Sequence, residues 1–277
     1  MDSGDSATAI GQKLVDNHLI ASKNIFILYV KFKELNLEAG DYLLPNNLAI
    51  TDIAGFLARG EHQVKWITTK ENWRNEQIAV YLNQNLGIST DEFLALAKGK
   101  QGKLFPDTYK LSDEPTAKEI VDRMLANYSE KTAGLQISNA TLTLASIIER
   151  EAGGDADRGD IAGVFANRLA IGMKLQSNPT TEYQKDTNNY AGDGISNYKF
   201  WQELISGDIT GVKGEYNTYV VSGLPPAPIC NPGLDAIKVA LNPNKNNYYY
   251  FFAGSDGTTY FSTTYAEQQA KEKLYLQ

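Results

Sequence analysis

The stretch from residue 142 to residue 168 constrains the fold more than any other, because it predicts a helix, a glycine stop and a second helix. In the first helix, Leu144, Ile147 and Ile148 have the i, i+3, i+4 spacing of a single apolar face. The next position on that face, i+7, is Glu151, so a carboxylate stands where the pattern requires an aliphatic side chain. Two glycines follow soon afterwards, which places Glu151 in the last turn of its helix.

This placement affects the acidity of Glu151. Removal from water disfavours the charged form of a carboxyl group and raises its pKa. The negative end of the helix dipole acts in the same direction. A carboxyl with a raised pKa is suited to general acid catalysis near neutral pH. The alternative is that Glu151 lies at a frayed helix end and simply reaches solvent.

A second glutamate, Glu149, precedes Glu151 by two positions. Residues two apart are separated by about 200° around a helix, so the two carboxylates do not face one site. Glu149 shares its side with Leu142, Ala145 and Ser146, which form a mixed face. We interpret Glu149 as a structural anchor or a solvated charge, with a role at the site as the alternative.

The composition limits the chemistry available to the chain. The net charge of −7, without a basic cluster, argues against a nucleic-acid partner. One cysteine, Cys230, and two histidines, His18 and His62, are too few for a zinc site or a cysteine-based metal site. Neither a P-loop nor a dinucleotide-binding motif is present. We therefore predict no metal and no cofactor, and any catalysis would use carboxyl, hydroxyl and amide groups.

The pattern of helices and strands predicts an α+β protein. With 277 residues the chain is long enough for two domains, and we predict a small α+β unit over 1–70 and a larger mixed helical and β domain over 71–277. The segment 26–32 fits a strand or a helix, and 42–47 predicts a short strand and turn. Further helices are predicted over 6–20, 51–59, 72–85, 91–98, 116–128, 161–169, 234–241 and 265–276, and further strands over 64–69, 248–253 and 259–262.

Residues 172–233 are rich in Gly, Pro, Asn, Thr and Tyr, which predicts a long irregular region. Such regions are usually functional when they are ordered inside a compact domain. The aromatic, amide and hydroxyl groups of residues 216–219, with the proline-rich stretch 223–228, are suited to the wall of a sugar-binding groove. The alternative is an ordinary loop braced by proline.

Several of these stretches together resemble one family, the YceG-like endolytic murein transglycosylases, or MltG family. The matching stretches include L-F-P-D-T-Y at 104–109, A-S-I-I-E-R-E at 145–151 and L-Q-S-N-P-T at 175–180, and their combination is highly specific. The likeness covers most of residues 100–270 and is weaker before residue 70, where the chain looks like the LysM-like segment of the family. The other matching stretches are 162–169, 171–174, 216–219, 223–229, 231–233 and 248–253.

The resemblance implies an activity and a set of site residues. Members of the family cleave the β-1,4 bond between N-acetylmuramic acid and N-acetylglucosamine inside peptidoglycan strands and leave a 1,6-anhydro end. The second glutamate of the family's E-x-E motif is catalytic and corresponds to Glu151. The residues expected to bind the glycan are Glu149, Gln176, Ser177, Asn178, Thr180, Tyr216, Asn217, Thr218 and Tyr219.

Four positions depart from the family pattern. Asn178 stands where aspartate is common, Gln101 where glutamate is usual, Lys103 where an aromatic residue is usual, and Ala227 where the family has glycine. These departures bear on substrate fit and pH dependence rather than on the type of reaction.

The resemblance also implies a location. The family works at the outer face of the bacterial cytoplasmic membrane, beside peptidoglycan synthases, and is typically tethered by one N-terminal membrane helix. No stretch here reaches the roughly 18 apolar residues of a membrane span, and no signal peptide is visible. We therefore expect the anchor to lie outside this chain, whose first residues are a native start or the edge of a trimmed one.

Two other functions remain open from the sequence. In a hydrolase, or muramidase, Glu151 would be the acid and a distant carboxylate such as Asp107 or Glu182 would be the base. In a non-catalytic glycan-binding scaffold of the cell-wall machinery, Glu151 would have no chemical role. The carboxylate on an apolar stripe argues against the scaffold.

Overall fold

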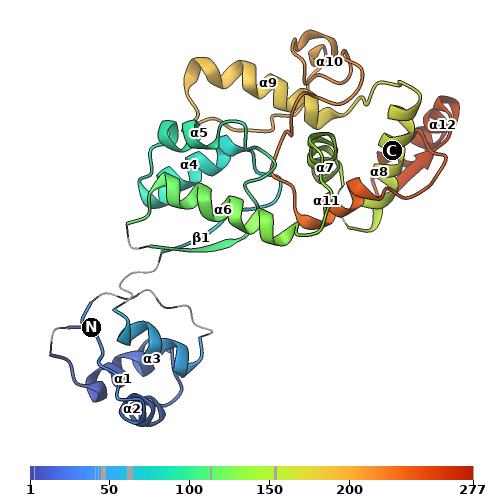
Figure 1. Cartoon of the computed structure of the whole chain (residues 1–277). Coiled ribbons are helices and arrows are strands. Elements are labelled where there is room, and N and C mark those ends of the chain that lie inside the picture. The colour runs from blue at the N-terminus through green and yellow to red at the C-terminus, as the bar shows by residue number, and fades with distance from the viewer. Residues whose placement is uncertain are drawn as a thin grey trace. The chain divides into compact units, whose positions relative to one another are not determined.

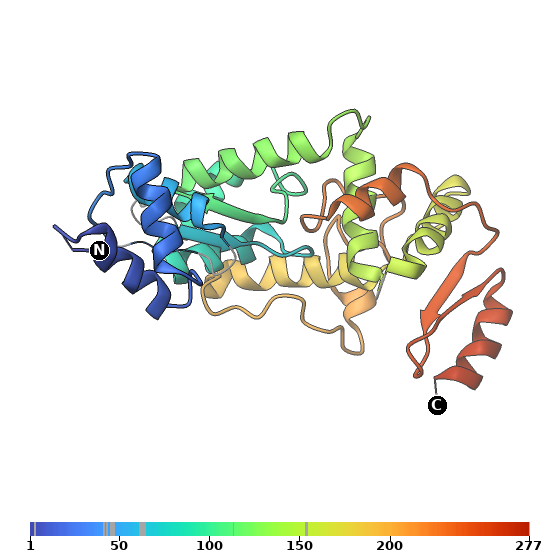
Figure 2. The same cartoon turned by 90° about the horizontal axis from the view of Figure 1, so that it is seen from below.

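The computed structural model describes all residues except 3, 41, 43, 45–47, 61–64, 113, 153–154 and 277, and it leaves out the side chains of 155–156 and 191–193. The chain divides into two compact units (Figures 1 and 2). The first comprises Met1–Thr68 and Thr108–Glu119, and the second comprises Thr69–Asp107 and Ile120–Gln277. The mixed helical and β character predicted from the sequence is confirmed.

Among the residues that the structure describes, the elements wholly inside the first unit are the helices α1 (Ala7–Asp16), α2 (Lys23–Phe32) and α3 (Ile50–Ala58) and the strands β1 (Lys65–Thr68) and β2 (Thr108–Leu111). Ser6 caps α1 by accepting a hydrogen bond from the Ala9 amide. The ambiguous segment 26–32 is helical, because Phe26 and Val30 bury one face at the i, i+4 spacing. Most of the strand and turn predicted at 42–47 lies outside the described residues.

The pairing of β1 with β2 explains why residues far apart in sequence belong to the first unit. The strands are antiparallel, with Lys65 opposite Leu111 and Thr68 opposite Thr108. The predicted boundary at residue 70 lies two residues beyond the first segment of this unit. That division of the chain into domains 1–70 and 71–277, and the LysM-like character of the first, stay predictions.

The second unit holds most of the helices. Its elements are α4 (Asn75–Leu86), α5 (Thr90–Ala97), α7 (Asn139–Glu151), α8 (Asp155–Ala170), α9 (Asn178–Asp193), α10 (Asp208–Gly211), α11 (Leu234–Leu241), β3 (Tyr250–Ala253), β4 (Thr259–Ser262) and α12 (Tyr265–Tyr275). A further helix, α6 (Ala117–Lys131), begins in the first unit and continues into the second. The strands predicted over 248–253 and 259–262 are confirmed as β3 and β4, which pair antiparallel as a hairpin and pack on α12 (Figure 2).

The core of the second unit is built around α7. Leu142, Ile147 and Ile148 are almost fully buried and pack in one cluster with Phe165 of α8 and Ile237 of α11. Figure 1 shows α7 between α9 and α11, and it contacts both of them as well as α8. Because the surrounding helices hold α7 on several sides, its C-terminal end has a fixed position in the unit.

The prediction of a long irregular region over 172–233 is wrong for residues 178–193, which form α9. Ser177 is the N-cap of α9 and Pro179 lies in its first turn, as is common for proline in helices. The buried face of α9 is largely polar and includes Thr180, Thr181 and Asp186. An apolar periodicity was therefore absent from the sequence, although a helix is present.

Three helix starts also differ from their predictions, most of all that of α8, which begins at Asp155 rather than at residue 161. The cap of α5 is Ser89, whose hydroxyl accepts a hydrogen bond from the Glu92 amide, and Thr90 is already helical. Helix α4 begins at Asn75 rather than at residue 72. In the part of the chain that the structure describes, no helix is both long and apolar enough to cross a membrane.

Candidate active site

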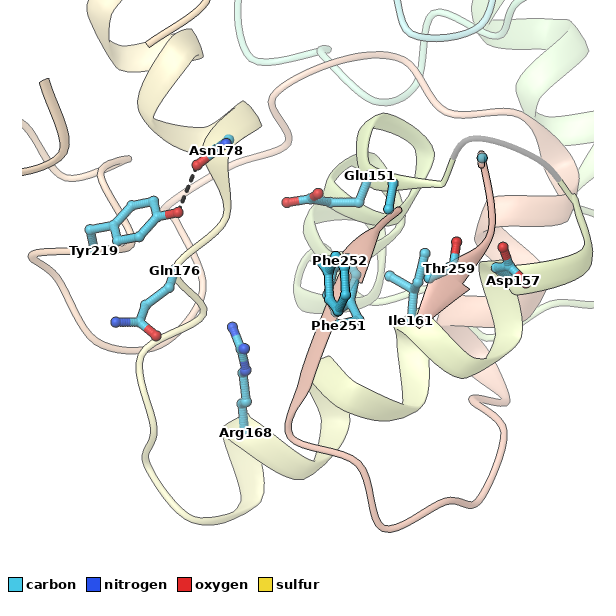
Figure 3. Close-up of a pocket in the computed structure, with 12 residues that line it drawn as sticks. Glu151, Asp157, Ile161, Arg168, Gln176, Asn178, Tyr219, Phe251, Phe252 and Thr259 are labelled. Atoms are coloured by element: carbon cyan, nitrogen blue, oxygen red, sulfur yellow. Dashed lines mark hydrogen bonds between the residues drawn. The ribbon is translucent and has the colours of Figure 1, made fainter. Parts of the chain in front are cut away.

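A cavity of about 530 Å³ opens at the C-terminal end of α7 (Figure 3). Four of the residues predicted for the site line it: Glu151, Gln176, Asn178 and Tyr219. In Figure 3, Glu151 and Arg168 point into the same space, and the Asn178–Tyr219 pair lies across from Glu151. The other lining residues come from α8 and from the β3–β4 hairpin and are Asp157, Ile161, Arg168, Phe251, Phe252, Ala253, Gly257 and Thr259.

Glu151 is the last residue of α7 and is half-buried at this cavity. Burial raises the pKa of its carboxyl, although the Ser177 hydroxyl and the charges of Arg168 and Arg150 act in the opposite direction. The Ser177 hydroxyl donates a hydrogen bond to Glu151 Oε1 at 2.6 Å. Of the two interpretations open from the sequence, this geometry supports the carboxyl with a raised pKa rather than the solvated helix end.

Ser177 is held in place by buried threonines. Its amide donates to Thr218 Oγ1 at 3.0 Å, and its carbonyl accepts from the Thr180 hydroxyl at 2.7 Å. The hydroxyl oxygens of Thr180 and Thr218 are 2.8 Å apart. Ser177, Thr180 and Thr218 are each at most 1% exposed, so the two threonines orient Ser177 rather than line the cavity.

Asn217 has a similar supporting position. Its side-chain amide donates to the carbonyls of Ile209 and Val212, and its Oδ1 accepts from the Thr181 hydroxyl and from the Tyr219 amide. The side chain is fully buried. Asn217 therefore fixes the backbone that presents Tyr219 to the cavity.

The far wall of the cavity is formed by Asn178, Tyr219 and Gln176. The Tyr219 hydroxyl donates to Asn178 Oδ1 at 2.6 Å. Burial and the neighbouring charge of Glu151 raise the pKa of Tyr219. Gln176 has a backbone φ of +50°, a left-handed conformation that is unfavourable for residues other than glycine. Its amide donates to the Thr218 carbonyl, which helps to hold this conformation beside the cavity.

Glu149 lies away from this cavity. Its side chain is buried, Oε2 accepts a hydrogen bond from the Gly233 amide at 3.0 Å, and Oε1 is 3.4 Å from Arg158 Nη2. Glu149 thus joins α7 to α8 and to the start of α11. This position supports the structural anchor rather than the substrate-binding role.

Tyr216 lines a different cavity from the other predicted residues. Its ring packs against Tyr183 with centroids 4.8 Å apart. Its backbone amide donates a hydrogen bond to Gln184 Oε1. The four residues 216–219 therefore divide between two cavities and the structure that supports them.

Arg168 is the main residue of this cavity that the sequence analysis did not single out. It is 6% exposed, its Nε donates to the Tyr249 carbonyl at 2.6 Å, and its Nη1 donates to the Leu175 carbonyl. Burial lowers the pKa of its guanidinium, and the charge of Glu151 acts against that shift. A signal existed in the sequence, because Arg168 occupies position i+7 of the apolar stripe that begins at Ile161.

Two further charged residues, Arg150 and Glu182, interact electrostatically with Glu151. Arg150 lies over the ring of Trp201, 3.8 Å from its centroid. Burial raises the pKa of Glu182 to about 7, Arg150 opposes the shift, and the charge of Glu151 adds to it. Neither Glu182 nor Asp107, the two carboxylates considered as a base, lines the cavity. Asp107 interacts with Lys131 and Asn127. No group of three metal-ligating side chains occurs among the described residues.

Comparison with known proteins identifies relatives of this chain. The chain is 32% identical to a protein of Bacillus subtilis strain 168 named endolytic murein transglycosylase, over 99% of this chain and 83% of that protein. It is 30% identical to the protein of that name from Streptococcus pneumoniae D39, over 94% of this chain and 54% of that protein. A crystal structure of a yceG-like protein from Listeria monocytogenes matches with a TM-score of 0.61 and 29% identity, over 98% of this chain and 96% of that one.

The sequence model of the YceG-like family matches residues 1–273, which is nearly the whole length. The predicted resemblance is therefore confirmed, and the chain belongs to the YceG-like family.

Proposed function

We propose that this chain is an endolytic peptidoglycan lytic transglycosylase. It would cleave the β-1,4 bond between N-acetylmuramic acid and N-acetylglucosamine, leave a 1,6-anhydro end, and so terminate or release glycan strands. The observation that carries the proposal is the half-buried Glu151 carboxyl, with its raised pKa, in an open cavity. The names of the relatives from Bacillus subtilis and Streptococcus pneumoniae support the same reaction class.

The chemistry needs only one carboxyl group. In the first step the protonated Glu151 donates its proton to the glycosidic oxygen while the bond from that oxygen to the anomeric carbon breaks. The 6-hydroxyl oxygen of the same sugar forms the new bond to the anomeric carbon. Its proton passes to the Glu151 carboxylate, which restores the acid. Because no water is activated, the second carboxylate of an ordinary glycosidase is dispensable.

Ser177 and Arg168 have distinct roles in this proposal. The Ser177 hydroxyl donates to Oε1 and so fixes the rotation of the Glu151 carboxyl, which leaves Oε2 for the glycosidic oxygen. The Arg168 guanidinium shares the cavity and stabilises the carboxylate that forms after proton donation. The opposing effects of burial and of Arg168 keep the acid strong enough to donate a proton.

The remaining walls are suited to a sugar polymer. Phe251 and Phe252 offer apolar faces, and Tyr219 offers a ring that is held by Asn178. Gln176 and Asn178 supply amide groups for sugar hydroxyls, and both side chains are exposed. A glycan strand would therefore lie between the start of α9 and the β3–β4 hairpin.

The test is mass spectrometry of the products released from purified sacculi by the parent chain and by Glu151→Gln. We expect anhydro-muropeptides from the parent and none from the variant, which keeps the same shape but cannot donate the acid proton. Activity of Glu151→Gln close to that of the parent would refute the assignment of the catalytic acid.

One observation favours a second candidate, the hydrolase. Glu182 has a pKa raised to about 7 and interacts electrostatically with Glu151, so it could act as a general base at neutral pH. Product ends separate the two reactions, since hydrolysis leaves a reducing end and transglycosylation leaves an anhydro end. Glu182→Gln should abolish turnover only in the hydrolase. Binding without turnover in the parent, unchanged by Glu151→Gln, would instead support a glycan-binding scaffold.

The proposed reaction places the protein in the bacterial cell envelope, where peptidoglycan strands are its substrate. Three further expectations follow from the family resemblance. The protein would work at the outer face of the cytoplasmic membrane, be tethered by an N-terminal anchor, and associate with peptidoglycan synthases. The LysM-like character of the first unit belongs to the same proposal, because such a unit would help to hold the strand.

A further inference from the structure

The second unit contains another cavity, of about 470 Å³, between α4, the end of α5 and α9. Three tyrosines line it, Tyr183, Tyr190 and Tyr216, and two lysines, Lys98 and Lys103, lie at its edge. Both lysines are exposed, whereas Tyr183 is 8% exposed. The cavity therefore has an aromatic floor and a charged rim.

The floor is held by several contacts before any ligand binds. The rings of Tyr183 and Tyr216 lie 4.8 Å apart. The side-chain amide of Gln101 donates to the Tyr183 hydroxyl at 3.0 Å and to the Pro228 carbonyl at 2.8 Å. Its Oε1 accepts from the Asn75 amide at 3.0 Å. Because these groups are already satisfied, a ligand would meet a preorganised surface.

The charge of this cavity is positive. Its carboxylate Glu76 is bound by the fully buried Arg74 at 2.8 Å and by the Tyr190 hydroxyl at 2.9 Å, so its charge is compensated. Within the part of the chain that the structure describes, the ammonium groups of Lys98 and Lys103 have no hydrogen-bond or ion-pair partner. Two uncompensated cations thus lie at one rim in a chain of net charge −7.

The two cavities share the same supporting elements. Helix α9 contributes Asn178 to the first and both Tyr183 and Tyr190 to the second, and the segment 216–219 contributes Tyr219 and Tyr216 in the same way. At 1.5 Å per residue, the positions from Asn178 to Tyr183 and to Tyr190 are separated along α9 by about 8 and 18 Å. A polymer bound at the first cavity can therefore reach the second.

We propose that this second cavity binds a carboxylate-bearing peptide branch of the glycan strand. The inference rests on the proposed function, because it takes the polymer of that reaction as the ligand. The sugar backbone of this polymer carries amides and hydroxyls, and its acidic groups are on the peptides attached to it. Lys98 and Lys103 pair with the peptide carboxylates, and the tyrosine floor covers the apolar part of the branch.

The positions that depart from the family pattern give this inference a further basis. Gln101, Lys103 and Ala227 all line the second cavity. Compared with the expected glutamate and aromatic residue, Gln101 removes one negative charge and Lys103 adds one positive charge. The preference for an acidic branch is thus a property of this chain rather than of the pattern it departs from.

The test measures binding in the Glu151→Gln background, so that strands are not cut. The probes are peptidoglycan strands that keep their peptides and strands from which an amidase has removed them. Amide hydrolysis leaves a lactyl carboxylate on each N-acetylmuramic acid, so the second probe has negative charges on its backbone and lacks only the peptide branch. We expect Lys98→Gln/Lys103→Gln to weaken binding of the peptide-bearing strands by about threefold to tenfold, the range of two exposed ion pairs. Binding of the peptide-free strands should change by less than about twofold.

The matched control is Lys199→Gln/Lys245→Gln, which removes the same charge from two exposed lysines that line neither cavity. The proposal would be overturned if Lys98→Gln/Lys103→Gln weakened binding of both probes equally or did not weaken binding of the peptide-bearing strands. It would also be overturned if the control variant lost as much binding. Since the readout is binding, it is separate from cleavage. Turnover that persists in Glu151→Gln refutes the catalytic assignment, whereas indifference to the two lysines refutes only the peptide site.

Discussion

The two cavities of the second unit differ in which charged groups are compensated by a partner, although both are lined by α9 and the segment 216–219. In the first, Glu151 is left with a raised pKa because burial outweighs the nearby cations. In the second, Glu76 is fully compensated by Arg74, and the free charges are lysines at the rim. A half-buried acid is suited to proton transfer, whereas exposed cations beside tyrosines are suited to selecting a ligand.

The largest expected effect separates chemistry from binding. Glu151→Gln should lower the turnover number by about 10²–10⁴-fold, the usual contribution of a general acid, and leave strand binding at both cavities intact. Its stability should not fall. Because the pKa of Glu151 is higher in the folded than in the unfolded protein, its ionisation makes folding less favourable as the pH rises from the unfolded to the folded pKa. An uncharged amide at this position avoids that loss of stability at neutral pH. Turnover assays and urea unfolding at pH 7 measure the two effects.

Glu149→Gln is the matched control, because it makes the same change two residues earlier. It breaks the contact of a buried carboxylate with Arg158 and should lower the free energy of unfolding by about 3 kcal/mol. The two variants should thus show opposite patterns of stability and turnover. Similar losses of stability in both would contradict the difference between an anchor and an acid.

The next effect concerns the floor of the second cavity. A glutamate at position 101 cannot donate to the Pro228 carbonyl, as the Gln101 amide does. Gln101→Glu should therefore lower the free energy of unfolding by about 1–3 kcal/mol. It should also weaken binding of peptide-bearing strands. Gln136→Glu, at an exposed position, is the control and should leave unfolding unchanged.

Ser177→Ala should have a smaller effect, confined to the first cavity. The Ser177 hydroxyl lowers the pKa of Glu151, so its removal raises that pKa further. Because the reaction starts from the protonated acid, the decline of activity with rising pH should move to higher pH. Loss of orientation should lower turnover by about tenfold, the equivalent of one hydrogen bond to a charged group. Ser129→Ala, on the exposed side of α6, is the control, and an unchanged pH profile for Ser177→Ala would contradict the role given to Ser177.

The smallest expected effect comes from Asn178→Asp, which restores the residue common in the family. The new carboxylate shares the cavity with Glu151, and a like charge raises the pKa of a neighbouring acid. We expect the alkaline limb of the pH profile to move upward by less than about one unit. A downward shift, measured with the same strands, would show that the two side chains do not interact in this way.

The sequence was sufficient for the parts of the fold that apolar periodicity encodes. The stripe of α7 predicted both its buried face and the place of Glu151, and Glu151 lies at the cavity. The same rule applied to α8 points to Arg168, since Ile161, Val164 and Phe165 are buried and Arg168 follows at i+7. Glu151 and Arg168, which have opposite charges and line the same cavity, thus share one sequence pattern: each follows an apolar stripe at position i+7.

The rest depended on contacts that no local pattern contains. Helix α9 buries Thr180 and Asp186, and their partners lie 38 residues away at Thr218 and 15 away at Trp201. The hydrogen bond from Ser177 to Glu151 spans 26 residues. Polar burial of this kind becomes favourable only when the distant partner is in place, so a single sequence does not reveal it.

The position of α9 has one more consequence. A helix is stiff along its axis, so the separation between Asn178 at one cavity and Tyr190 at the other stays constant while a strand is bound. When one strand occupies both cavities, α9 sets a constant distance between the site of cleavage and the bound branch. We expect the cut to fall a set number of sugars from a branched unit, and the product lengths would then record that interval.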